Sequence, residues 1–202
     1  GAVKYAWMKE YYPAQYEEMK KFIESGRWHI SGASWDATDT LVPSIESAIR
    51  NIMLGQDYYR KEFGVESTDI FLPDCFGFGW TLPAIASHCG LIGFSSQKLQ
   101  WRNKPFYGND KYPFTVGLWQ GIDGSTIMMT HGYDYNQRFE DGDLSENKDL
   151  LELTGHSPLH MVYRYYGTGD IGGSPTLESV RAVEKGLQGN GPLQIVSATS
   201  DR

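Results

Sequence analysis

One acid, Asp74, stands where an apolar strand gives way to a glycine-rich loop. The apolar run 70–72 ends in a proline, and Asp74 comes next. Two glycines follow, and then Thr81 and Pro83 mark the start of a helix. In α/β barrels the active site lies where strands end and loops begin, so an acid at this place is positioned for chemistry. The alternative on spacing alone is that Asp74 only caps the loop.

The segment 73–77 (Pro-Asp-Cys-Phe-Gly), with Pro83 and Gly90 downstream, resembles the nucleophile segment of glycoside hydrolase family 38, the zinc-dependent retaining α-mannosidases. In that family the matching aspartate attacks the anomeric carbon and also ligates zinc, so the resemblance implies both roles for Asp74. It runs through nearly the whole chain but covers only the interior of a longer catalytic domain. We therefore expect residues 1–202 to form a single domain, a fragment of the family's N-terminal catalytic domain.

A second carboxyl group is needed about 5–5.5 Å from the first for retaining glycoside hydrolysis. Asp170 follows a predicted strand and precedes a predicted helix, as Asp74 does. The family has a similar Gly-Asp segment that carries its general acid, so the resemblance implies the acid/base role for Asp170. Family members often have His after this aspartate, whereas this chain has Ile171. The alternative is that Asp170 caps the helix that follows.

A Tyr-Asp pair that lines the sugar pocket in the family matches Tyr133 and Asp134, which follow a predicted strand. The resemblance therefore implies that both contact substrate. His131, just before them, is interpreted as a structural or supporting histidine and not as a zinc ligand.

Lys98 resembles a family site where a basic residue lies beside the nucleophile, and a cation there would hold Asp74 ionised. The alternative is an exposed lysine. Trp35 lies in another strand-end segment that faces the pocket in the family, and its ring could stack on sugar. Asp39 in the same segment could line the pocket.

The sequence differs from the family in its zinc ligands. The family has four: the His and Asp of a His-x-Asp motif, the nucleophile Asp and a downstream His. This chain has no His-x-Asp motif, and only Asp74 matches a ligand. None of its five histidines matches: His29, His88, His131, His156 and His160. We expect zinc in an intact parent enzyme, with weak metal binding and little or no turnover by the chain alone.

Composition limits the partners. A formal net charge of −7 argues against binding a nucleic-acid backbone, and no apolar stretch has transmembrane length. We expect α-mannoside glycans as partners, no nucleic acid, no membrane, and self-association through open sheet edges. The spacing of Cys75 and Cys89 fits no zinc motif, and both are interpreted as small buried hydrophobic residues; the alternative is a disulfide between them.

Helical and strand patterns alternate along the chain. Helices are predicted at 13–25, 43–63, 82–88, 149–153 and 174–187, and strands at 28–34, 69–72, 91–95, 114–119, 125–130, 160–166 and 193–197. This alternation favours an α/β fold with a mainly parallel sheet and surrounding helices. The resemblance implies a partial (β/α)7-type barrel.

Three other functions are weighed against that of an α-mannosidase. A carbohydrate-binding or structural fragment could keep part of a sugar pocket without metal. The segment 167–172 fits G-x-G-x-x-G, but the helix start at 174–175 already explains its setting, and Asp201 lies later than the usual acidic partner of a dinucleotide fold. A polysaccharide deacetylase would require Asp-Asp and His-x3-His motifs, which this chain lacks.

Overall fold

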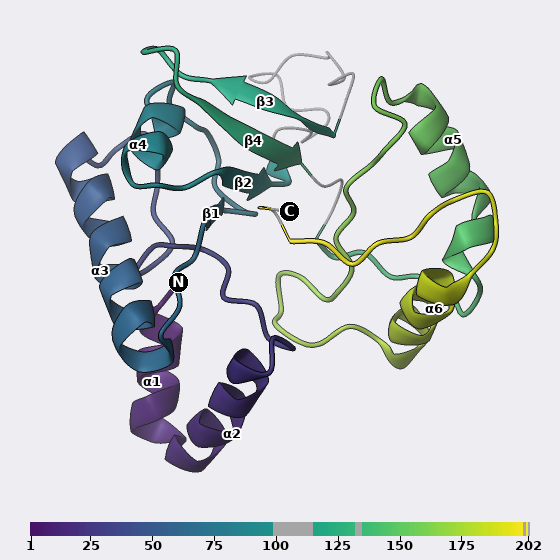
Figure 1. The fold of residues 1–202 in the computed structure, drawn as a ribbon, viewed down its shortest axis with the longest axis horizontal. Coiled ribbons are helices and arrows are strands. Elements are labelled where there is room, and N and C mark those ends of the chain that lie inside the picture. Colours follow the sequence, from purple (N-terminus) through teal and green to yellow (C-terminus); the bar gives the residue numbers. More distant parts are fainter. Residues whose placement is uncertain (99–114, 132–134, 200, 202) are drawn as a thin grey trace. The chain divides into compact units, whose positions relative to one another are not determined.

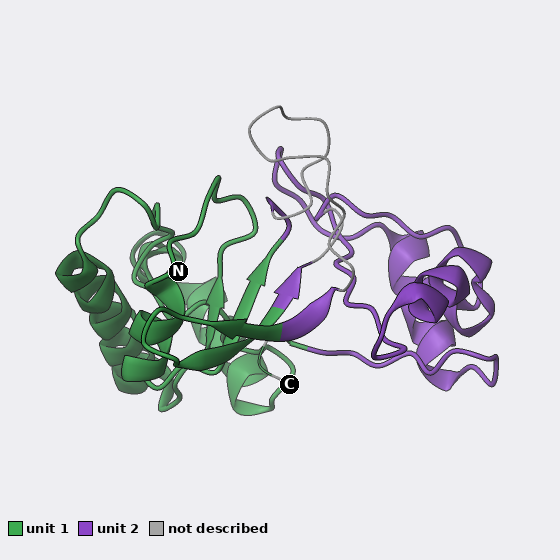
Figure 2. Cartoon of the chain, turned by 90° about the horizontal axis from the view of Figure 1, so that it is seen from above, with its two compact units in different colours: residues 1–96, 118–129, 199–202 green, residues 97–117, 130–198 purple. Residues whose placement is uncertain are grey.

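The computed structural model describes residues 1–98, 115–131, 135–199 and 201. The chain divides into two compact units (Figure 2). Unit 1 contains residues 1–96, 118–129 and 199–202, and unit 2 contains residues 97–117 and 130–198. Each unit has its own hydrophobic core.

Four helices belong to unit 1 (Figure 1): α1 Val3–Tyr11, α2 Pro13–Glu24, α3 Ile45–Phe63 and α4 Leu82–His88. The last three were predicted, whereas α1 was not. The ends of α3 follow from its sequence, because the Ser44 side chain accepts a hydrogen bond from Ser47 N and Gly64 adopts the left-handed conformation (φ 67°) that ends the helix.

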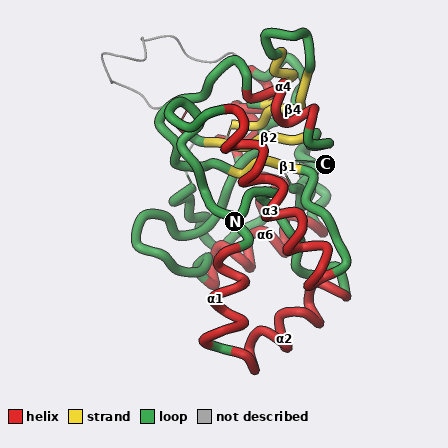
Figure 3. Tube along the Cα trace, turned by 90° about the vertical axis from the view of Figure 1, so that its left-hand side faces the viewer, coloured by secondary structure: helices red, strands yellow, loops and turns green. Residues whose placement is uncertain are grey.

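Within the described ranges, four strands form one sheet in the order β1-β2-β4-β3. The strands are short, and long loops connect many of the elements (Figure 3). Their bounds are β1 Asp69–Phe71, β2 Gly93–Ser96, β3 Val116–Gln120 and β4 Thr126–His131. β1 and β2 are parallel, with Asp69 paired to Gly93. β3 and β4 form a hairpin whose turn contains Gly124 at φ 87°. The prediction of an α/β fold with a mainly parallel sheet is confirmed.

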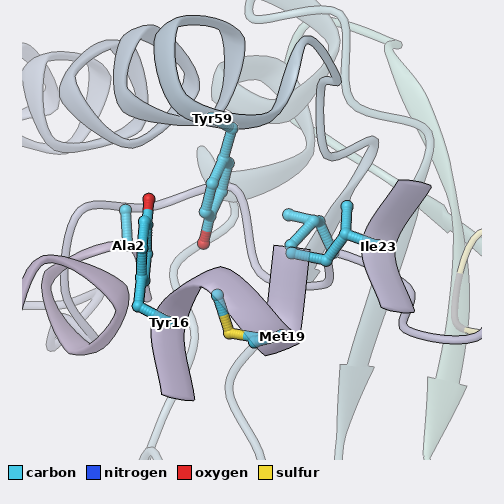
Figure 4. Packing of buried hydrophobic residues seen from close by; sticks show 6 residues of the cluster. Ala2, Tyr16, Met19, Ile23 and Tyr59 are labelled. Carbon is cyan, nitrogen blue, oxygen red and sulfur yellow. The ribbon is translucent and has the colours of Figure 1, made fainter. Parts of the chain in front are cut away.

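The core of unit 1 is rich in aromatic side chains (Figure 4). Tyr16 and Tyr59 are almost completely buried and pack with Ala2, Met19 and Ile23. At the edge of this cluster, Glu62 accepts hydrogen bonds from Lys9 Nζ (2.7 Å) and Tyr16 Oη (2.8 Å). These bonds tie α1 and α2 to α3.

The described part of unit 2 contains a 3-10 turn, η2 Leu144–Glu146, and the helices α5 Lys148–His156 and α6 Leu177–Gln188. Both helices were predicted, but α6 begins later than expected. Its N-cap is Thr176, whose side chain accepts from Ser179 N, and not Ser174. Leu144, Leu150 and Ala182 form the buried core of this unit.

Three predicted strands are not formed. Segment 28–34 lies beside β1 but contributes one ladder-like bond, from Ala33 N to Asp69 O (2.9 Å). Segment 160–166 has no strand pairing, and His160 at its start adopts the left-handed conformation (φ 51°). In segment 193–197, Leu193 and Ile195 pack against the core of unit 2. The alternating apolar pattern there serves helix packing and not a sheet.

The structure also bears on the expected membrane-spanning segments and cysteine side chains. No helix in the described part of the chain is long and apolar enough to cross a membrane. Cys75 and Cys89 are free thiols, as interpreted, but each is half-buried and not fully buried as expected.

Candidate functional site

Asp74 lies on an exposed turn three residues beyond the end of β1. Leu72, the residue after β1, fixes the course of the chain toward Asp74. It is buried, and its N–H donates to Ser95 O (3.0 Å) in the neighbouring strand. Pro73 then ends the pairing, since proline has no N–H to donate. The predicted placement of Asp74 at a strand end is therefore confirmed.

A second loop packs on the one that carries Asp74. Thr40 Oγ1 donates to Gly77 O (2.7 Å), and Cys75 Sγ donates to Thr38 O (3.1 Å). Asp39 lies in this second loop, where its Oδ1 accepts from the N–H groups of Leu41 and Val42 (2.7 and 3.0 Å). Two acids, Asp39 and Asp74, therefore lie in two loops of unit 1 that are hydrogen-bonded to each other.

The charges of these two acids affect the nearby thiol of Cys75. The pKa of Cys75 is raised, first by burial and then by the nearby carboxylates of Asp39 and Asp74. The pKa of Cys89, on the same unit, is raised by burial alone. Two carboxylates of unit 1 therefore lie close enough to Cys75 to raise the pKa of its thiol.

Helix α3 holds the segment with Trp35 in place. Trp35 N donates to Asn51 O (2.8 Å), and the Asn51 side chain exchanges two hydrogen bonds with the Asp36 backbone (3.1 and 2.9 Å). The Trp35 ring packs edge-on against Tyr58, with centroids 5.8 Å apart, at the margin of the unit 1 core. Its indole is half-buried, so part of the ring contributes to packing.

A cavity of about 40 Å³ lies within unit 1, and Asp39, Thr38 and Ser34 contribute to its lining. A single ordered water needs roughly 10–15 Å³ on the same kind of measure. The cavity can therefore hold a few water molecules but not a sugar ring. Asp39 lines this cavity, but its expected place in the lining of a sugar pocket stays a prediction.

Asp170 lies in unit 2, where its Oδ1 accepts a hydrogen bond from Tyr135 Oη. Two further bonds tie the same segments together: Gly167 N donates to Gln137 O (2.9 Å), and Gly169 N donates to Asn136 Oδ1 (3.4 Å). Asp170 does not cap α6, because Thr176 performs that role.

The residue missed by sequence reasoning is Tyr135, which directly contacts the predicted general acid. Its N–H donates to Gln97 Oε1 (3.1 Å), just beyond β2. The sequence could have indicated only that Gln97 and Tyr135 both lie in segments that follow a strand. It carried no indication that a tyrosine hydroxyl would meet Asp170.

The other predicted site residues divide between the units. Trp35, Asp39 and Asp74 belong to unit 1, and Lys98 and Asp170 to unit 2. Lys98 is half-buried, two residues beyond β2. Tyr133 and Asp134 lie outside the described residues.

His131 ends β4 and is completely buried, with its N–H bonded to Thr115 O (2.9 Å). This agrees with the interpretation of His131 as a structural residue. Among the residues that the structure describes, no three His, Cys, Asp or Glu side chains come together to hold a metal. A catalytic zinc needs three protein ligands, so the described residues alone do not fit that ion.

Sequence comparisons with known proteins agree on one family. The sequence model of the "Glycosyl hydrolases family 38 N-terminal domain" matches residues 2–201. Alpha-mannosidase G of Dictyostelium discoideum is 37% identical over 186 residues, which cover 89% of this chain and 16% of that protein. Alpha-mannosidase 2C1 of Homo sapiens is 30% identical over 176 residues, which cover 84% of this chain and 16% of that protein.

Solved structures show the same fold at lower identity. An alpha-mannosidase from Enterococcus faecalis V583 superposes with a TM-score of 0.60 at 16% identity, over 89% of this chain and 20% of that one. A 4-alpha-glucanotransferase from Thermococcus litoralis gives 0.58 at 14% identity, over 92% of this chain and 28% of that one.

Together, the fold and the sequence matches define a domain of the glycoside hydrolase class. The chain belongs to glycoside hydrolase family 38 and matches its N-terminal domain. It spans about a sixth of the length of the curated relatives.

Proposed function

We propose that this chain is part of a retaining α-mannosidase that hydrolyses terminal α-linked mannose in glycans. The observation that carries the proposal is 37% identity with an α-mannosidase across 89% of the chain. The acid at the end of β1, in the segment that resembles the family's nucleophile segment, supports it. The four-stranded sheet would then be one part of a (β/α)7-type barrel completed by the rest of the enzyme.

In the proposed mechanism, Asp74 attacks the anomeric carbon and forms a covalent mannosyl ester. Asp170 first donates a proton to the departing glycosidic oxygen and then takes one from the water that hydrolyses the ester. Negative charge at the end of β1 would stabilise the oxocarbenium-like transition state. Tyr133, Asp134, Lys98 and Trp35 are proposed as substrate contacts.

Zinc belongs to the proposal only for the larger enzyme. The described residues supply Asp74 but no set of three ligands, so no step is derived through a metal. We propose that Asp74 is one zinc ligand and that the others come from outside the described residues. Bound zinc would supply Lewis-acid contacts to the sugar hydroxyls.

The test is hydrolysis of an aryl α-mannoside by the complete gene product. Nuclear magnetic resonance of the first-formed sugar should show the α-anomer, because two displacements restore the configuration. Asp74→Asn should reduce turnover by at least about 10³-fold, since a carboxamide cannot act as the nucleophile. Asp57→Asn is the control, because Asp57 pairs with Lys61 on the exposed side of α3.

Three outcomes would contradict the proposal: no hydrolysis, a β-anomer as first product, or full activity in Asp74→Asn. Glycan binding without hydrolysis would instead favour a non-catalytic carbohydrate-binding domain.

A further inference from the structure

The contact between Tyr135 and Asp170 gives the two oxygens of the carboxyl group different surroundings. Tyr135 Oη donates to Oδ1 of Asp170. We propose that Tyr135 is a positioning residue that keeps Oδ1 as the accepting oxygen, so that Oδ2 exchanges the proton with substrate. The inference rests on the proposed acid/base role of Asp170.

The backbone around this contact is braced on both sides. On one side, Tyr135 N donates to Gln97 Oε1 (3.1 Å). On the other, Gly169 N donates to Asn136 Oδ1 (3.4 Å). The second bond holds the backbone of Gly169, next to Asp170, against the side chain of Asn136, next to Tyr135, and so keeps the two segments together where the hydroxyl meets the carboxyl group.

The absence of a side chain at position 169 makes the contact possible. A Cβ atom added to Gly169 would lie 1.8 Å from Cδ2 of the Tyr135 ring. The ring therefore occupies the space that any larger residue would need. Asp170 itself is in the left-handed region (φ 61°), which non-glycine residues rarely adopt and which persists where the surroundings hold it.

The chemical consequence follows from the two steps of a retaining glycosidase. A protonated carboxyl group has one oxygen that carries the proton and one that accepts. With the tyrosine hydroxyl bonded to Oδ1, the proton lies on Oδ2 and passes to the leaving oxygen as the glycosidic bond breaks. In the second step, Oδ2 takes a proton from the attacking water.

Leaving-group dependence tests this role in the complete gene product. Tyr135→Phe should lower kcat/KM about 10- to 100-fold for a methyl α-mannoside, whose leaving oxygen needs the proton. For a 2,4-dinitrophenyl α-mannoside, which needs none, the loss should stay under about threefold. Tyr166→Phe is the matched control, since it removes a hydroxyl in unit 2 but keeps the ring that packs on Phe139.

Two more variants complete the test. Gly169→Ala should show the same leaving-group selectivity as Tyr135→Phe, because it displaces the ring. In an Asp170→Asn background, Tyr135→Phe should cause no further loss, because no acid remains to position.

The inference would be overturned if Tyr135→Phe reduced both substrates equally, reduced neither, or still lowered activity in the Asp170→Asn background. The outcome for Asp170→Asn alone separates the two proposals. If its loss does not depend on the leaving group, the acid/base role of Asp170 is wrong. If the loss in Asp170→Asn depends on the leaving group but the loss in Tyr135→Phe does not, only the positioning role of Tyr135 is wrong.

Discussion

Gly55→Ala should destabilise the chain, although Gly55 lies inside helix α3. Helix propensity alone predicts the opposite sign, since alanine in a helix interior is more favourable than glycine by about 1 kcal/mol. In the structure, however, a Cβ at position 55 would lie 2.1 Å from Ala33 O and 2.7 Å from Trp35 N. Both are backbone atoms, which cannot rotate away.

The magnitude follows from what the helix would lose. Moving the neighbouring segment away breaks the bond from Trp35 N to Asn51 O and the two bonds between Asn51 and Asp36. At about 1 kcal/mol each, their loss outweighs the gain in helix propensity and leaves a net destabilisation of about 2 kcal/mol. The same displacement would move Trp35 away from Tyr58.

Urea denaturation followed by circular dichroism measures this effect. Gly155→Ala is the matched control, because Gly155 lies in helix α5 with no atom within 4 Å of its added Cβ. The control should be neutral or stabilised by up to about 1 kcal/mol. If Gly55→Ala is as stable as the control, the close approach of α3 to the segment around Trp35 is wrong.

Two further predictions concern ionisable groups in unit 1. Asp74→Asn should speed alkylation of Cys75 by iodoacetamide at pH 8 but leave the rate for Cys89 unchanged, because the Asp74 carboxylate raises the pKa of Cys75 and not that of Cys89. Equal alkylation rates for Cys75 in the variant and the unmodified protein would contradict this effect of Asp74. The hydrogen bond from Lys9 lowers the pKa of Glu62, so Glu62→Gln should lower the free energy of unfolding by about 1 kcal/mol above pH 5. This difference in stability should vanish as the pH falls through the folded-state pKa of Glu62. A difference in urea midpoint that persists at pH 3 would refute this.

The helices that could be predicted carry their signals locally. In α3, Ser44 and Gly64 lie at the two ends of the predicted helical segment, where Ser44 is the N-cap and Gly64 the C-cap. Segment 193–197 shows the limit of such patterns. Its apolar residues suit a strand equally well, and only the presence of the unit 2 core decides that they pack there.

The candidate site divides in the same way. The placement of Asp74 was predictable, because a strand, a proline and a glycine loop are adjacent in sequence. The partner of Asp170 was not, because Tyr135 lies 35 residues away and meets it only where Gly169 leaves room for the ring. Contacts of this kind depend on tertiary packing and leave no periodic trace in the chain.

Trapping the covalent intermediate tests the central claim most directly. A slow fluorinated mannosyl fluoride should accumulate a mannosyl ester on the complete gene product, and mass spectrometry of its peptides would locate the ester. The account predicts the label on Asp74 and no label in Asp74→Asn. A label on another carboxylate, or hydrolysis of aryl α-mannosides with no labelled peptide, would contradict it.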